Sequence, residues 1–107
     1  MRVDFYIYTK KWSSRTLEIE VKILNRLGLH ARPAALIAQA ASSFAADITL
    51  TPEGGSTADA KSILSLLMLG APCGTVLTLQ VRSSDAAEEA EAAEKISGLF
   101  AAKFDEE

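Results

Sequence analysis

Two stretches of this chain, far apart in the sequence, alternate apolar with polar residues. The first, residues 17–23, has its apolar residues at Leu17, Ile19, Val21 and Ile23. The second, residues 75–82, places three on one side, Leu77, Leu79 and Val81. A period of two is typical of a strand that buries one face and exposes the other. The sequence therefore predicts a sheet with one apolar face that other elements must cover.

Two further strands are predicted at residues 47–51 and 56–60, separated by a turn rich in proline and glycine. Helices are predicted over residues 31–43, with Pro33 in the first turn, and over residues 61–69, with Ser62 as the cap and Gly70 as the end. A last helix follows Asp85, with Glu88 placed to complete a capping box. The acidic run of this helix is expected to face solvent, and its inner face to comprise Ala93, Ile96, Phe100 and Phe104.

The predicted order is strand, helix, strand, strand, helix, strand, helix, or βαββαβα. Helices on one face of an antiparallel sheet make a two-layer α+β domain. A chain of 107 residues is about one domain, and we assign that domain to residues 17–107. Residues 1–16 are expected to form a poorly ordered or loosely docked extension. An extra strand, a packing arm, a cloning remnant and an upstream start codon are the alternatives for it.

Composition excludes several classes of function. The net charge of −3 argues against general nucleic-acid binding, which needs a basic excess. One cysteine, Cys73, and one histidine cannot form a disulfide or a metal-binding cluster, so we expect neither metal nor cofactor. Without an apolar run of about 18 residues or a secretory signal, no membrane insertion is expected. A cytoplasmic protein is the expectation, because a single unpaired thiol suits a reducing compartment.

The single histidine, His30, falls where the first helix begins. The first turn of a helix has unpaired backbone N–H groups and a positive dipole end, which attract anions. Arg32 adds a guanidinium suited to phosphate oxygens. We therefore predict that His30 accepts a phosphoryl group, held by Arg32 and the backbone N–H groups of Ala31 and Arg32. The alternative is an ordinary surface or capping histidine.

The segment Gly28-Leu29-His30-Ala31-Arg32-Pro33-Ala34 resembles the active-site signature of HPr, the histidine phosphocarrier of the bacterial phosphotransferase system. A second segment, Lys61 to Gly70, resembles the regulatory-serine segment of that family, and Gly74-Thr75 also fits. The resemblance extends from about residue 16 to residue 104. It implies an open-faced β-sandwich, in which four antiparallel strands are covered on one face by three helices.

The resemblance also implies a function. His30 would be phosphorylated on Nδ1 by the phosphoenolpyruvate-dependent enzyme I and would donate the group to an enzyme IIA protein, with Arg32 stabilising the phosphate. Such a chain is a covalent phosphohistidine intermediate rather than an enzyme with its own turnover. Small carriers that dock transiently are usually monomeric, so a monomer is expected.

Regulation is a further implication of the resemblance. Ser62 corresponds to the serine that HPr kinase/phosphorylase modifies, which would alter docking to enzyme I, although Ser62 also suits a plain helix cap. Residues 25–28, 66–69 and 99–107 resemble the nitrogen-related NPr branch. The alternative function is therefore a regulatory NPr-type or serine-phosphorylated module that controls metabolism or a transcription regulator. A small autonomous phosphatase ranks lower, because no second acid or base lies near His30 in the sequence.

The helix over residues 61–69 has more apolar residues than one buried face can hold. Ile63 and Leu64, near its start, are predicted to contact partners. Leu66, Leu67 and Leu69 are expected mainly in the core, with Leu67 also a candidate for the partner surface. Cys73 is interpreted as an incidental loop residue.

Overall fold

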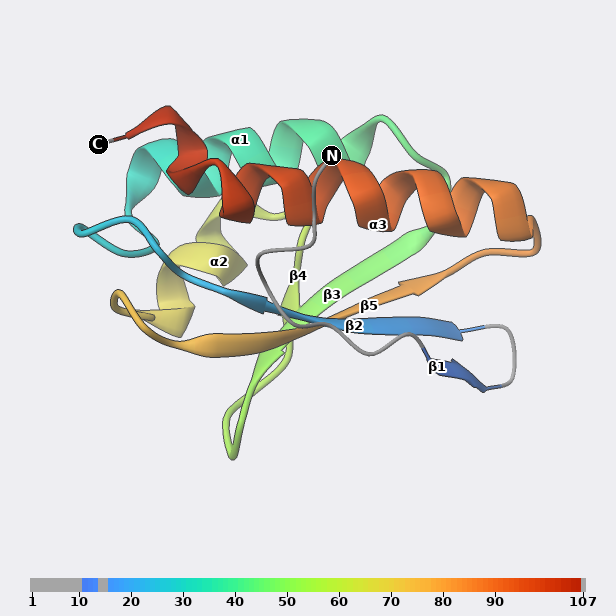
Figure 1. Cartoon of the computed structure of the whole chain (residues 1–107), viewed down its shortest axis with the longest axis horizontal. Helices are drawn as coiled ribbons and strands as arrows, with labels where there is room; N and C mark the ends of the chain where they lie inside the picture. Colours follow the sequence, from blue (N-terminus) through green and yellow to red (C-terminus); the bar gives the residue numbers. More distant parts are fainter. Residues whose placement is uncertain (1–10, 14–15, 107) are drawn as a thin grey trace.

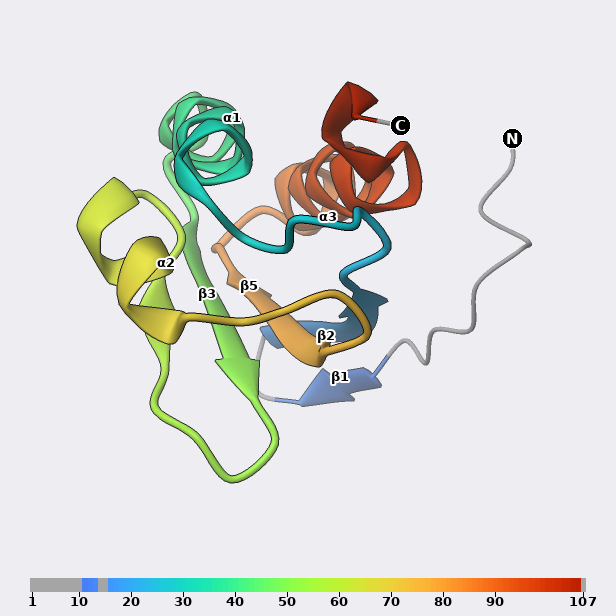
Figure 2. The same cartoon turned by 90° about the vertical axis from the view of Figure 1, so that its left-hand side faces the viewer.

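The computed structural model describes residues 11–13 and 16–106. A sheet and a layer of helices lie one above the other (Figures 1 and 2). The elements in chain order are β1 (Lys11–Ser13), β2 (Thr16–Lys22), α1 (Ala31–Ser42), β3 (Asp47–Pro52), β4 (Ala58–Asp59), α2 (Ile63–Leu69), β5 (Val76–Arg82) and α3 (Ala86–Ala101). A short turn, Lys103–Asp105, follows α3.

The sheet has the strand order β1-β2-β5-β3-β4, and every neighbouring pair is antiparallel. The two alternating stretches pair directly in the centre, where Ile19 lies opposite Leu79 and Val21 lies opposite Leu77. Because their periods coincide in this register, the buried side chains of both strands, including Leu17, Ile19, Val21, Leu77, Leu79 and Val81, point to the same face. The predicted α+β fold class is therefore confirmed. β4 is shorter than the strand expected over residues 56–60.

The sheet contains one strand that the predicted order lacks. β1 pairs with β2, with Trp12 opposite Leu17 and Ser13 opposite Thr16. An extra strand was one of the alternatives for the N-terminal extension, although a poorly ordered or loosely docked segment was favoured. A strand of three residues is too short to give a readable period of two. Residues 1–10 and 14–15 of the extension lie outside the described residues.

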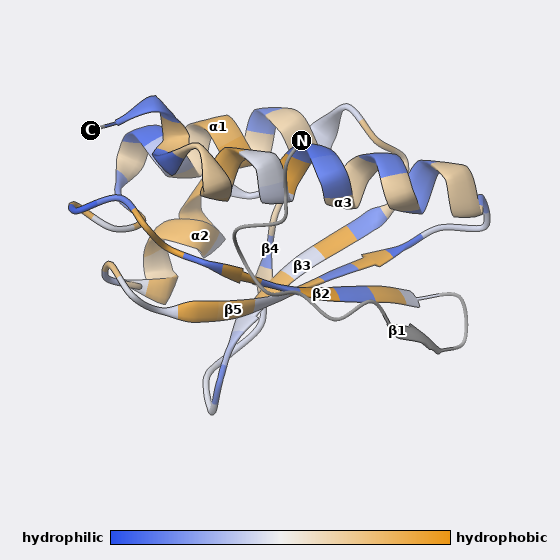
Figure 3. Ribbon diagram, viewed as in Figure 1, coloured by the Kyte–Doolittle hydropathy of each residue, from blue (hydrophilic) through white to orange (hydrophobic). Residues whose placement is uncertain are grey.

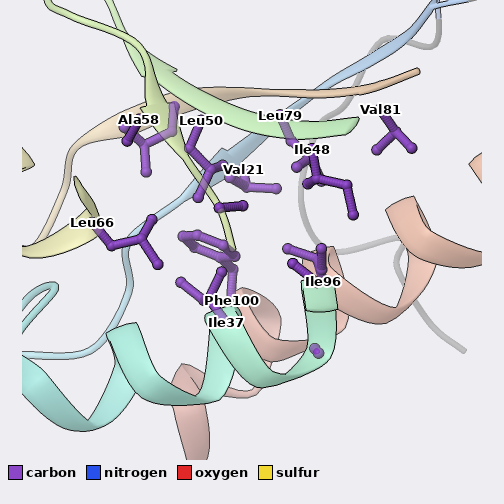
Figure 4. Close-up of a cluster of buried hydrophobic side chains, with 14 of the residues drawn as sticks. Val21, Ile37, Ile48, Leu50, Ala58, Leu66, Leu79, Val81, Ile96 and Phe100 are labelled. Atoms are coloured by element: carbon purple, nitrogen blue, oxygen red, sulfur yellow. The ribbon is translucent and has the colours of Figure 1, made fainter. Parts of the chain in front are cut away.

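The core lies between the sheet and the three helices. In Figure 4, Leu50 and Leu79 of the sheet face Ile37 of α1 and Phe100 of α3, while Leu66 of α2 closes the side. All five side chains are almost fully buried. Figure 3 shows that hydrophilic and hydrophobic residues alternate along α3. The predicted inner face of this helix is confirmed, because Ala93, Ile96, Phe100 and Phe104 are buried.

Side-chain caps begin two of the helices as the sequence predicts. Ser62 Oγ accepts a hydrogen bond from the Ser65 N–H at 3.1 Å, and Asp85 Oδ1 accepts one from the Ala87 N–H at 2.9 Å. The capping box at Asp85 does not close, however. The Glu88 carboxylate instead accepts from the Ser83 hydroxyl at 2.7 Å and from the Ala45 N–H at 3.0 Å, so it joins the start of α3 to the chain after α1.

One acidic residue of α3 does not face solvent, contrary to the expectation for the whole run. Glu89 is buried, with an exposed fraction of 1%. It lies on the same side of the helix as Ala93 and Ile96, at the spacing of an inward stripe. Its Oε2 accepts a hydrogen bond from the Ser83 N–H at 2.7 Å. The carboxylate is tolerated there because it satisfies a backbone donor at the helix entrance.

Gly28 brings two loops into close contact below the start of α1. It adopts a φ of 73° in the left-handed region. A Cβ at this position would lie 2.7 Å from the carbonyl oxygen of Ala71 and 3.0 Å from the Cα of Pro72. The next residue, Leu29, donates its N–H to that same carbonyl at 3.0 Å. This contact fixes the chain two residues before α1.

We predict that Gly28→Ala destabilises the fold by roughly 2–4 kcal/mol, because left-handed strain and a backbone clash combine. Gly54→Ala is the matched control, since Gly54 has the same φ of 73° but no atom within 4 Å of its Cβ position. The control should lose only about 1 kcal/mol. Urea unfolding of both variants measures the difference, and equal losses would contradict the proposed clash.

Candidate functional site

His30 is the N-cap residue of α1, with extended backbone angles of φ −94° and ψ −166°. Its side chain makes no capping hydrogen bond, so it is not the ordinary capping histidine. The side chain is 38% exposed. The ring is therefore accessible to a partner while its backbone is fixed at the start of the helix.

The first turn of α1 leaves backbone donors beside His30. Ala34 is the first residue whose N–H bonds within the helix, to the His30 carbonyl at 3.0 Å. Pro33 has no N–H. The N–H groups of Ala31 and Arg32 therefore precede the first intrahelical bond, and both residues are exposed. The ring and the two N–H groups of the predicted site thus lie at the N-terminal end of α1, and Arg32 belongs to the first turn of this helix.

Two residues that the sequence analysis did not assign to the site are linked to His30: Glu106 contacts the ring, and Asn25 holds Glu106. Oε2 of Glu106 lies 2.7 Å from Nε2 of the His30 ring. Oε1 of the same carboxylate accepts a hydrogen bond from Nδ2 of Asn25 at 3.0 Å. Asn25 is fully buried and also donates to the Gly28 carbonyl at 2.7 Å. The C-terminal turn, red in Figure 1, accordingly lies at the same end of the molecule as the start of α1.

The surroundings of Glu106 favour its ionised form. Desolvation by burial raises the pKa of this carboxyl, but the hydrogen bonds from Asn25 and His30 and the charges of His30 and Arg32 lower it and prevail. The pKa therefore lies below the ordinary value of 4.5. An ionised carboxylate only accepts hydrogen bonds. The hydrogen between Glu106 and His30 must then belong to the ring.

A left-handed turn carries Glu106 to the ring. Lys103, Phe104 and Asp105 have φ values of 55°, 54° and 61°, although none is glycine. This conformation costs roughly 1–2 kcal/mol for each non-glycine residue. Phe104 offsets part of the cost, since it is 1% exposed and packs edge-on against Phe100 with ring centroids 5.0 Å apart. The turn is thus stabilised by the burial of Phe104 and by the hydrogen bonds of Glu106.

α2 presents an apolar surface next to Ser62. Four of its residues are exposed: Ile63 (44%), Leu64 (67%), Leu67 (38%) and Met68 (78%). The expectation that Leu67 lies mainly in the core is wrong, because the inward position of this short helix is taken by Leu66. Leu69 is partly buried against the core, as expected. Ser62 is partly exposed at the start of this surface.

One hollow of the described surface has no lining residue in common with the His30 site. It is formed by the end of α1, the start of α3 and residues between them, including Asp47, Arg82 and Glu91. We place the site at His30 instead, because a ring presented to a protein partner needs no deep pocket.

Among residues 11–13 and 16–106, no acidic, histidine or cysteine cluster could hold a metal ion. No described helix is long and apolar enough to cross a membrane.

Comparison with known proteins gives a consistent picture. The family model described as "PTS HPr component phosphorylation site" matches residues 17–102. The phosphocarrier protein HPr of Treponema pallidum is 46% identical over 81% of this chain and 94% of its own length. The phosphocarrier protein NPr of Shewanella violacea is 46% identical over 84% and 94%. The crystal structure of HPr from Thermoanaerobacter tengcongensis superposes with a TM-score of 0.76 at 39% identity, covering 84% of this chain and 97% of that one.

The lowered pKa of Glu106 predicts a pH-dependent stability. The unfolded chain binds a proton more readily at this carboxyl than the folded chain, so the contribution is fully present above 4.5 and is lost as pH falls through the folded-state pKa. We expect wild type to be more stable than Glu106→Gln at neutral pH and the gap to close in acid. Urea unfolding across this range tests it, with Asp105→Asn controlling for net charge. A constant gap would contradict the prediction.

Proposed function

Because the chain belongs to the HPr family of phosphocarrier proteins of the phosphotransferase system, we propose that His30 is the residue that carries the phosphoryl group. The main support is the accessible ring of His30, which makes no capping hydrogen bond and lies at the start of α1, two residues before Arg32. The group comes from the phosphoenolpyruvate-dependent enzyme I and passes to an enzyme IIA protein. The chain acts as a covalent intermediate between them.

Phosphoryl transfer depends mainly on positioning and on charge stabilisation. In this proposal a ring nitrogen of neutral His30 attacks the phosphorus. The phosphoryl oxygens are then met by the N–H groups of Ala31 and Arg32 and by the Arg32 guanidinium, which pairs well with phosphate. Because the donor protein supplies the remaining contacts, a small site on an exposed helix start is sufficient.

The apolar surface of α2 serves as the docking surface for these partners. Ile63, Leu64 and Leu67 are exposed although they are apolar, and such patches mark interaction sites. Leu27, three residues before His30 in the chain, is also exposed, by 66%. One partner can therefore cover the α2 surface while it reaches His30.

Regulation through Ser62 is the second candidate function. Ser62 caps α2 immediately before Ile63 and Leu64, and its hydroxyl is partly exposed. A phosphate there adds about −1.5 to −2 charge at a helix start, where it is tolerated, but beside an apolar docking surface, where a partner must desolvate it. An enzyme of the HPr kinase/phosphorylase type is the proposed modifier. The modified form, or an NPr-type role, would control metabolism or a transcription regulator instead of sugar uptake.

Incubation with phosphoenolpyruvate and enzyme I is predicted to add one phosphate that is labile to acid and stable to base. His30→Ala should remove it completely, because no other histidine exists. Arg32→Ala should slow transfer roughly ten- to a hundredfold, the loss expected for a hydrogen bond to a charged group. Mass spectrometry and rapid-quench kinetics measure both effects. Phosphate retained by His30→Ala would refute the assignment.

A substitution on the α2 surface tests the proposed docking surface in the same transfer assay. Leu64→Ser should raise KM for this chain about five- to thirtyfold and leave kcat unchanged, because a buried leucine contributes roughly 1–2 kcal/mol to a contact. Its exposed side chain makes a loss of fold stability small. Leu66→Ala is the opposite control, since it removes core packing and should cost about 2–5 kcal/mol of stability. An unchanged KM for Leu64→Ser would exclude the surface.

We predict that an ATP-dependent HPr kinase labels wild type and Ser65→Ala but not Ser62→Ala. The labelled protein should accept phosphate from enzyme I at least tenfold more slowly, as expected where a charge is buried in an apolar contact. Ser62→Ala also loses the cap, at about 1 kcal/mol, so its fold is checked by thermal unfolding. Label on Ser62→Ala, or undiminished transfer to the labelled protein, would end the regulatory proposal.

A further inference from the structure

We propose that Glu106 is a positioning residue for phosphoryl transfer: its carboxylate holds the hydrogen of His30 on Nε2 and leaves Nδ1 as the attacking nitrogen. The same carboxylate then stabilises the ring after it has accepted the phosphoryl group. This inference rests on the proposed function of His30. Asn25 and Glu106 both lie outside the segment from Gly28 to Ala34 that resembles the active-site signature, within the two segments that resemble the NPr branch.

The geometry leaves one ring nitrogen for the reaction. Nε2 is occupied by Oε2 of Glu106 at 2.7 Å. The carboxylate cannot rotate away without losing the 3.0 Å hydrogen bond from Asn25, whose amide is fully buried and bonded to Gly28. A carboxylate has no hydrogen to offer, so in the neutral ring Nε2 carries the hydrogen and Nδ1 carries the lone pair. The selection of Nδ1 thus follows from the partner of the other nitrogen.

The charge on the ring changes during the step. The Nδ1 lone pair forms a bond to the phosphorus of a phosphorylated protein donor. The bond from phosphorus to the donor breaks, and its electron pair leaves with the donor. Nε2 keeps its proton, so the ring becomes positively charged, 2.7 Å from the negative Glu106. This attraction is absent in the neutral ring and grows along the reaction, so it favours the transition state over the starting state.

The C-terminal turn explains why the carboxylate stays in place. The middle one of its three left-handed residues, Phe104, is buried, and Glu106, which follows the three, is held by hydrogen bonds. Costly backbone conformations persist where the surroundings over-determine them, and they gather at functional sites. Asp105, the neighbouring acidic residue, is exposed and is not a hydrogen-bond partner of His30 or Asn25. Asp105→Asn therefore matches Glu106→Gln in charge and differs from it in contact with the ring.

The first test uses nitrogen-15 spectra of the His30 ring in alkaline solution, where the ring is neutral. Wild type and Asp105→Asn should show hydrogen on Nε2 alone. Glu106→Gln should show a measurable fraction with hydrogen on Nδ1, because the glutamine amide can also donate to Nε2. Hydrogen on Nδ1 in wild type, or a spectrum of Glu106→Gln identical to wild type, would overturn the proposal.

The second test is single-turnover transfer from phosphorylated enzyme I. At saturating donor, Glu106→Gln should be slowed about tenfold, the rate equivalent of one charge-assisted hydrogen bond. The donor concentration for half-maximal rate should stay within about twofold, since docking is not altered. Asp105→Asn should match wild type. Glu106→Gln as fast as Asp105→Asn would refute Glu106 while leaving His30 as the carrier. If wild type accepts no phosphate from an enzyme I that phosphorylates another HPr, the proposed function fails instead.

Discussion

The buried amide of Asn25 joins the turn before α1 to the C-terminal Glu106, and the site depends on both segments. One of its hydrogen bonds fixes the Gly28 carbonyl, which precedes α1, and the other holds the C-terminal Glu106. Its own oxygen, Oδ1, is buried with no hydrogen-bond partner among the described residues. An unpaired buried acceptor costs about 1–3 kcal/mol. The fold therefore bears a cost for this residue, and what it gains in return is a defined position of the ring and carboxylate at the start of α1.

Local patterns predicted most of the fold correctly, for reasons visible in the structure. The inward residues of β2 lie opposite the inward residues of β5, so the alternation in the sequence correctly predicts which side chains are buried. Ser62 and Asp85 cap their helices because a cap needs only residues three or fewer positions away. The errors come from contacts beyond that range. Glu88 and Glu89 form hydrogen bonds with Ser83, which precedes the helix. The left-handed turn at residues 103–105 contains no glycine, so no sequence pattern predicts it.

In the candidate site, too, the residues close together in the sequence were predicted and those far apart were not. His30 and Arg32 lie in one short segment, so their association with a helix start could be predicted directly. Glu106 lies 76 residues from His30 and 81 from Asn25, and nothing in a single sequence pairs positions at such a separation. Sequence reasoning therefore found the groups proposed to bind the phosphoryl oxygens and missed the groups that orient the ring. The missed pair is also the part that makes the two ring nitrogens inequivalent.

The extra strand β1 has a consequence for association between molecules. β2 is seven residues long, and without β1 its outer backbone groups would form a long open border. β1 pairs with Thr16, Leu17 and Glu18 of β2, so in the described residues it shortens the unpaired border of that strand. An unpaired border recruits strands from other chains in proportion to its length. β1 therefore covers part of the border at which a second molecule could add a strand to this sheet.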